Sequence, residues 1–213
     1  MRAETSAALR GRGGLGGFTM DVSSFATAYG LSTSIGLRPF LVLALASIAM
    51  HLGYLHPSHA FAYLGSDGAT WLLAALAVLE FAGDKVPVLD HTLHALHFVT
   101  KPIAAALLVG SALPQTGGSP DLATSALMGL GAFNALGVHA GIATLRGAST
   151  SLSGGLANPL ISVVEDALAL VAAVLAIVLP FAGALVAIVV TIVLVVIARR
   201  AFATLRNRAR DPA

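Results

Sequence analysis

Four acidic side chains interrupt stretches that are otherwise apolar enough to cross a membrane. They form two pairs, Glu80 with Asp84 and Glu165 with Asp166. An ionised group in hydrocarbon costs at least about 2.5–3.5 kcal/mol, so such groups are usually paired and often functional. Oxygen ligands of this kind suit a divalent cation, and one of two close carboxylates readily holds a proton. The pattern predicts ion binding or proton relay inside a bilayer. The alternative is an ion-pair network that locks helices together, for instance Arg38 or Lys85 with Glu165.

The spacing within each pair places the carboxylates relative to their helices. Glu80 and Asp84 are four residues apart and share one helix face. Glu165 and Asp166 follow Pro159 by six and seven residues, which is about 9–10 Å along a helix. We therefore expect both pairs near the middle of the membrane or in its cytoplasmic half, where they can face each other.

Histidines supply a second constellation. Asp90, His94, His97 and Lys101 are spaced by 4, 3 and 4 residues and form one stripe along a helix. Imidazoles and a carboxylate are suitable ligands for Zn²⁺ or another transition metal. The same stripe could shuttle protons. We favour a third interpretation, in which it is the polar face of a helix at the cytoplasmic interface.

Two short segments resemble each other. Residues 31–41 read LSTSIGLRPFL and residues 148–160 read ASTSLSGGLANPL, so both place Ser-Thr-Ser and Gly-Leu before a proline. A proline favours the first turn of a helix, so each segment predicts a break followed by a new helix. The free N–H groups of such a helix attract anionic groups. A polar substrate path would then be lined by Ser32, Thr33, Ser34, Arg38, Ser149, Thr150, Ser151 and Asn158. Ordinary helix capping is the alternative.

Composition defines the class of protein. The 213 residues are 57% hydrophobic and only 10% charged, with a mean hydropathy of +0.88, whereas soluble domains carry about 25% charged residues. The absence of cysteine excludes disulfides and thiolate chemistry, and the net charge of +2 gives no reason to expect nucleic-acid binding. An all-α, polytopic transmembrane bundle is expected, with broken or proline-initiated helices and an internal repeat of the kind found in transporters.

Hydropathy predicts about six spans. Their approximate ranges are 31–53, 69–86, 91–113, 122–146, 157–178 and 181–200. A half-helix at about 22–34 before the first span is an alternative that would change this count and make the repeat inverted instead of parallel. Residues 1–20 are expected to be a disordered tail, 21–205 the membrane domain and 206–213 a basic tail.

Loop charges predict the orientation. Lys and Arg occur at both ends of the chain and after the second and fourth spans, but not in residues 54–68 or 114–121. This alternation places both termini in the cytoplasm. Glycines of the fourth span could pack helices within one protomer or in a homo-oligomer: Gly129, Gly131, Gly137 and Gly141.

Three motifs carry a family resemblance: GLRPFL after Ser-Thr-Ser, LEFAGDKVPVLDHTLHAL leading into TKPIAAALL, and STSLSGGLANPLISVVEDALAL. Together they resemble a family of bacterial multi-pass membrane proteins known as domain of unknown function 4126, which implies no particular activity. The stretch Glu80 to Lys85 is also similar to the Glu-x-Gly-Asp-Lys motif of calcium and manganese cation/proton antiporters. Compared with that motif, this chain has one extra residue between Glu80 and Gly83.

These observations favour a small transporter or channel of the bacterial inner membrane. Its partners would be the lipid bilayer and a cation or small polar or anionic solute. The alternatives are a metal-dependent enzyme acting on a lipid-linked substrate and a structural or assembly protein. A divalent cation is the only cofactor that the residues point to.

Overall fold

The computed structural model describes residues 21–83, 87–114 and 119–210, and every regular element in them is helical. In chain order these are α1 (Val22–Leu37), α2 (Pro39–His51), the 3₁₀ helix η1 (His59–Gly65), α3 (Asp67–Gly83), α4 (Pro87–Ala112), α5 (Leu122–Ser153), α6 (Asn158–Val178) and α7 (Pro180–Arg210). The predicted all-α bundle is confirmed. α7 continues through residues 206–210, which we had assigned to a basic tail.

The described chain has fewer membrane-crossing helices than the six we predicted. The helices α4, α5, α6 and α7 each contain a stretch long and apolar enough to cross a membrane. The η1–α3 pair makes a fifth candidate, bent by 61° between its two parts. The difference arises at residues 31–53, which do not form one span.

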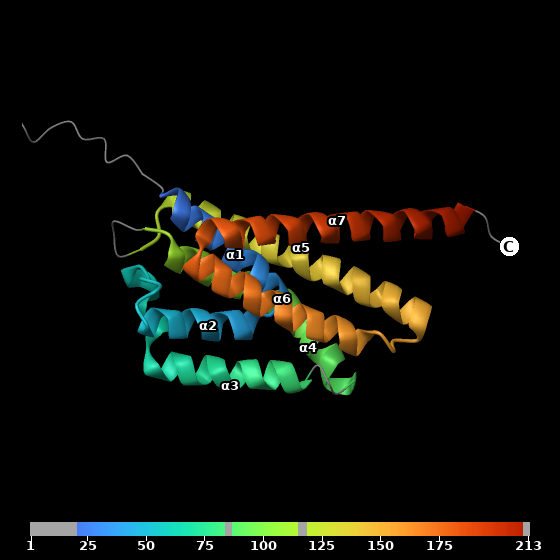
Figure 1. Cartoon of the computed structure of the whole chain (residues 1–213), viewed down its shortest axis with the longest axis horizontal. Helices are drawn as coiled ribbons and strands as arrows, with labels where there is room; N and C mark the ends of the chain where they lie inside the picture. The colour runs from blue at the N-terminus through green and yellow to red at the C-terminus, as the bar shows by residue number, and fades with distance from the viewer. Residues whose placement is uncertain (1–20, 84–86, 115–118, 211–213) are drawn as a thin grey trace, which may run out of the picture.

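The first predicted span is instead a broken helix that turns back on itself (Figure 1). At 1.5 Å per residue, α1 is about 24 Å long and α2 about 20 Å, so neither reaches across a hydrocarbon core of about 30 Å. α1 enters from one end of the bundle, the chain reverses at Arg38, and α2 returns to the same end. The upstream half-helix that we considered is therefore present, with bounds of Val22–Leu37.

The chain consequently begins α1 and ends α7 at opposite ends of the bundle (Figure 1). The loops that join α2 to α3 and α4 to α5 lie at the end where α1 starts. With one hairpin and five crossings, the two ends would lie on opposite sides of a membrane. Our expectation of two cytoplasmic termini depended on an even number of crossings.

α1 forms the centre of the molecule and packs against α4, α5, α6 and α7. Every residue from Leu31 to Pro39 is buried. Small residues allow this close approach. A Cβ atom on Gly36 would lie 2.5 Å from the Cβ of Val138, and one on Gly30 would lie 2.7 Å from the Cβ of Ala176. The core therefore depends on glycine at these two helix crossings.

The glycines of α5 fall into two groups by their surroundings. Gly131 lies against Val109 and Gly141 lies against Leu194, so these two pack helices inside the protomer. Gly129 and Gly137 have no atoms within 4 Å of the place where a Cβ would stand.

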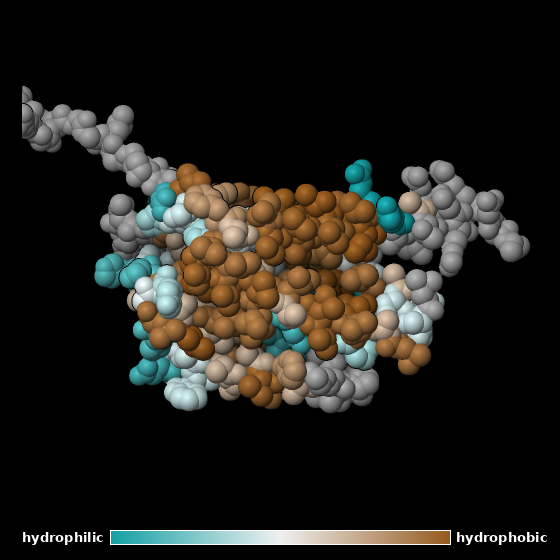
Figure 2. All heavy atoms as spheres, in the orientation of Figure 1, coloured by the Kyte–Doolittle hydropathy of each residue, from teal (hydrophilic) through white to brown (hydrophobic). Residues whose placement is uncertain are grey.

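The outer surface is apolar over α6 and α7, as expected for helices that face lipid (Figure 2).

The end of α2 is joined to the start of α3 by a histidine. The Nδ1 atom of His51 lies 3.1 Å from the carbonyl oxygen of Ser47, and its Nε2 lies 2.9 Å from a carboxylate oxygen of Asp67. The Ser47 carbonyl and then the Asp67 carboxylate raise the pKa of His51 above its usual 6.5. The protonated ring donates to both, so this contact holds the hairpin to α3.

This contact predicts a pH-dependent contribution to stability. Because the pKa of His51 is raised on folding, its stabilisation is complete below about pH 6.5 and is lost as pH rises through the raised value. We expect wild type to melt above a His51→Gln variant at about pH 5 and to match it at about pH 9. Thermal unfolding in detergent measures this difference, with Asp67→Asn as a second variant of the same pair. A difference that does not change with pH would contradict the assignment.

Candidate functional site

The break between α1 and α2 is the centre of the candidate site. Proline disfavours a helical conformation in the residue before it, and Arg38 is extended, with φ −134° and ψ 94°. Pro39 then starts α2, where its missing N–H has no cost. The last carbonyl groups of α1 and the first N–H groups of α2 are thereby left without helical partners inside the bundle. Charged side chains from α3 and α4 satisfy them.

A carboxylate from α3 occupies the start of α2. Oε2 of Glu80 accepts hydrogen bonds from the backbone N–H groups of Phe40, at 3.2 Å, and Leu41, at 3.3 Å. The partial positive charge of a helix N-terminus stabilises an anion at this position. The other carboxylate oxygen of Glu80 lies 3.2 Å from Nε2 of His97, on α4. Both side chains are buried, so Glu80 links three elements inside the protein.

An ammonium group from α4 occupies the end of α1. Nζ of Lys101 donates to the carbonyl of Gly36, at 2.9 Å, and lies 3.1 Å from Nδ1 of His139. Because an ammonium group can only donate, Nδ1 of His139 accepts, and the neutral ring carries its proton on Nε2. The same Nζ lies 3.9 Å from Oε1 of Glu165, on α6.

Two arginines complete the network. Nε of Arg38 lies 2.6 Å from a carboxylate oxygen of Asp166, and its Nη2 donates to the hydroxyl of Ser162 at 2.7 Å. Nη2 of Arg146, on α5, lies 2.6 Å from Oε2 of Glu165. Both acidic residues of α6 are therefore paired with a cation from another helix.

The charges of this network balance among the described residues. Its three cations are Arg38, Lys101 and Arg146, and its three carboxylates are Glu80, Glu165 and Asp166. All six side chains are at most 18% exposed while also paired, and Arg38 and Lys101 are only 2% exposed. Pairing lowers the large cost of burying charge.

A family model described as a domain of unknown function (DUF4126) matches residues 25–200. The chain belongs to this family. No curated protein and no solved structure matches it. The residues matched by the DUF4126 model include the broken helix and the whole charge network.

The network of this DUF4126 protein corresponds only in part to the site predicted from sequence. Glu80, Glu165 and Asp166 all approach the α1–α2 break, and the contacts described for each are with basic side chains or backbone N–H groups. Asp84 lies outside the described residues. The sequence analysis missed the central position of Lys101, although a lysine followed by proline in an apolar stretch was a visible signal.

Of the three predicted metal ligands, the structure describes the side chain of His97 alone. Asp90 and His94 lie in α4, but their side chains are outside what the structure describes. His97 contacts Glu80. Within the described part of the DUF4126 chain, no three acidic or histidine side chains lie close enough to hold a metal ion.

The two Ser-Thr-Ser segments lie far apart. Nδ2 of Asn134 donates to the hydroxyls of Ser32 and Thr33, each at 2.9 Å, whereas Ser34 bonds back to the carbonyl of Gly30. Thr150 lies 16 residues further along α5 than Asn134, about 24 Å away.

The second segment lies at the end of the bundle. There the Thr150 and Ser151 hydroxyls bond back to carbonyls of α5, and Asn158 donates to Thr150. Ser149 is half-buried on the same turn. The structure therefore does not join the two predicted halves of a substrate path.

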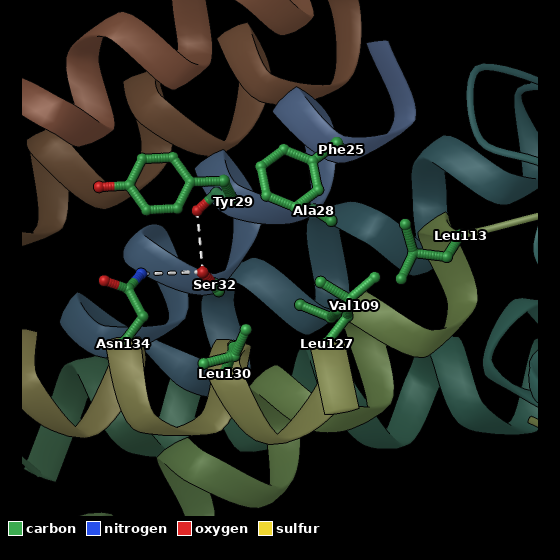
Figure 3. A pocket seen from close by; sticks show the side chains of 10 residues that line it. Phe25, Ala28, Tyr29, Ser32, Val109, Leu113, Leu127, Leu130 and Asn134 are labelled. Carbon is green, nitrogen blue, oxygen red and sulfur yellow. Dashed lines mark hydrogen bonds between the residues drawn. The ribbon is translucent and has the colours of Figure 1, made fainter. Parts of the chain in front are cut away.

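A pocket of about 220 Å³ lies beside the first segment, between α1, α4 and α5 (Figure 3). Phe25, Leu113 and Leu127 line its apolar side, and Ser32 and Asn134 lie at its polar side. The hydroxyl of Ser32 donates to the Tyr29 carbonyl at 2.9 Å while it accepts from Asn134.

Proposed function

We propose that this DUF4126 protein is a small membrane transporter that uses its buried charge network as a proton relay. The observation that supports this most is the occupied helix break: Glu80 holds the start of α2, and Lys101 holds the end of α1. In secondary transporters, broken helices use such ends to bind ions and substrate groups in the membrane. Here titratable side chains of the protein stand at both ends.

The relay would pass through groups that can each gain and lose a proton. Glu80 contacts His97, and Lys101 lies between His139 and Glu165. The two imidazole rings connect these halves, with centroids 6.1 Å apart and planes nearly perpendicular. A turn of one ring, or one bridging water, would carry a proton across this gap.

The relay has a natural exit at one end of the bundle. Arg146, which is paired with Glu165, is 13% exposed, compared with 3% for Glu165. It lies toward the end of the bundle where α7 finishes. That end carries Arg199 and Arg200, whereas residues 54–68 and 114–121, which join helices at the opposite end, have no Lys or Arg, although three arginines precede α1 in the sequence. The rule for basic residues makes it the cytoplasmic side, so we propose a location in the cytoplasmic membrane with the C-terminus inside.

The charge balance supports a second candidate, a structural or assembly role. Three cations matched by three carboxylates could serve only to hold α1 and α2 between the other helices. The two functions differ in what neutral substitutions do. A relay needs groups that titrate, but a structural network needs only the shape and the hydrogen bonds.

Proton flux into proteoliposomes under an imposed pH gradient tests the proposal. We expect Glu165→Gln to reduce flux to the level of empty vesicles, because glutamine keeps the shape of the side chain but cannot exchange a proton. Asp121→Asn is the matched control, since Asp121 is exposed at the N-cap of α5, outside the network, and asparagine also caps a helix, so its flux should equal that of wild type. Full flux in a folded Glu165→Gln protein would support the structural role instead.

A further inference from the structure

A lateral groove opens the buried network toward the surrounding lipid. It has a volume of about 540 Å³, within the range of small-molecule sites. Its walls come from α3, with Phe81 and Val78, and from α6, with Val163 and Leu170. α3 packs on α2 and α4 but not against α6, so these two helices stand apart. Figure 2 shows hydrophilic atoms inside a hollow between the hydrophobic surfaces of this region.

The charged side chains form the deepest part of this groove. Arg38 and Glu80 are each 2% exposed and Asp166 is 18% exposed, whereas Phe81, Val78 and Val163 are more than half exposed. A ligand entering from the side therefore meets apolar walls first and then the Asp166 carboxylate.

The charge of the floor selects the sign of the ligand. Among the described residues that line the groove, the charged groups are two carboxylates, Glu80 and Asp166, and one guanidinium, Arg38. Nε and Nη2 of Arg38 already contact Asp166 and Ser162, so an incoming anion would compete with a carboxylate for them. An incoming cation would be attracted by Asp166, the most accessible of the three. The exposed ring of Phe81 adds an aromatic surface of the kind that binds organic cations.

We propose that this groove binds an organic cation with an apolar body, whose positive group pairs with Asp166 while its apolar groups lie between α3 and α6. This names a class of solute for the transporter proposed above and takes its physiological meaning from that proposal. Binding itself needs no proton movement, so it can be measured separately.

Two neighbouring valines of α6 provide a matched test. Val163 lines the groove and is 57% exposed, whereas Val164 does not line it and is 50% exposed. Both face outward, so a tryptophan at either position should leave the fold intact. Val163→Trp would fill the groove and Val164→Trp would project into lipid elsewhere.

The experiment measures equilibrium binding of tetraphenylphosphonium to the full chain in nanodiscs, without a pH gradient. We expect saturable binding of one cation per chain, weakened at least tenfold by Val163→Trp and by Asp166→Asn, and unchanged by Val164→Trp. Tetraphenylborate, an anion of the same shape, should not saturate. Non-saturable binding, preference for the borate, or equal effects of the two tryptophans would overturn the cation site.

Cation binding and proton flux can fail independently, so the experiment distinguishes the groove from the relay. Saturable cation binding in a protein that conducts no protons would retain the groove and reject the relay. Proton flux with no cation binding would reject only the groove.

Discussion

Replacing Arg38 by methionine is expected to lower the free energy of unfolding by about 3–5 kcal/mol, the usual cost of breaking a buried ion pair. Arg38 is 2% exposed and lies 2.6 Å from Asp166, so its loss leaves a carboxylate without this cation inside the bundle. The hydroxyl of Ser162 also loses the hydrogen bond from Arg38. Unfolding of the purified protein by denaturing detergent in mixed micelles measures the change.

A double variant shows whether the loss of stability comes from the Asp166 carboxylate that loses its ion pair. If the cost comes from the carboxylate that is left, Arg38→Met with Asp166→Leu should recover most of the lost stability, because two apolar side chains can replace a buried pair. Arg199→Met is the control for removing an arginine, since Arg199 is exposed on α7. No recovery in the double variant would show that Arg38 acts mainly through contacts other than Asp166.

The sequence predicts the position of the helix break but not its direction. Pro39 disfavours a helical conformation at Arg38 wherever the pair occurs, so the break follows from local chemistry. The reversal of the chain depends on glycine contacts such as those of Gly36 with α5, which involve residues about 100 positions away. Apolar composition alone predicts one long span over 31–53, because hydropathy does not distinguish a hairpin buried in protein from a helix facing lipid.

The pairing of charges was also beyond the sequence. The acidic residues were visible as costly groups in apolar helices, and the need for partners follows from that cost. Which cation meets which carboxylate depends on the rotation and depth of each helix. A shift by one residue turns a helical side chain by about 100°. The groups at the helix ends that bind Glu80 and Lys101 are backbone atoms, so residue types in the sequence do not identify them.

The second large effect is expected at Glu80, where two substitutions should have different consequences. Glu80→Ala removes the acceptor for the N–H groups of Phe40 and Leu41, and each buried group left unsatisfied costs about 1–3 kcal/mol. We therefore expect a marked loss of stability and a loosened start of α2. Hydrogen exchange at Phe40 and Leu41, together with detergent-induced unfolding, measures both.

Glu80→Gln should keep the fold and lose the relay. The amide oxygen of glutamine can still accept from the two N–H groups, so unfolding should cost much less than in Glu80→Ala. The amide cannot exchange a proton with His97, which lies 3.2 Å from the glutamate, so proton flux should fall to the background of empty vesicles. A Glu80→Gln protein that is stable and still transports protons would make Glu80 a helix cap alone. Since the relay would then have lost its first member at the start of α2, protons would have to enter through Lys101 and Glu165.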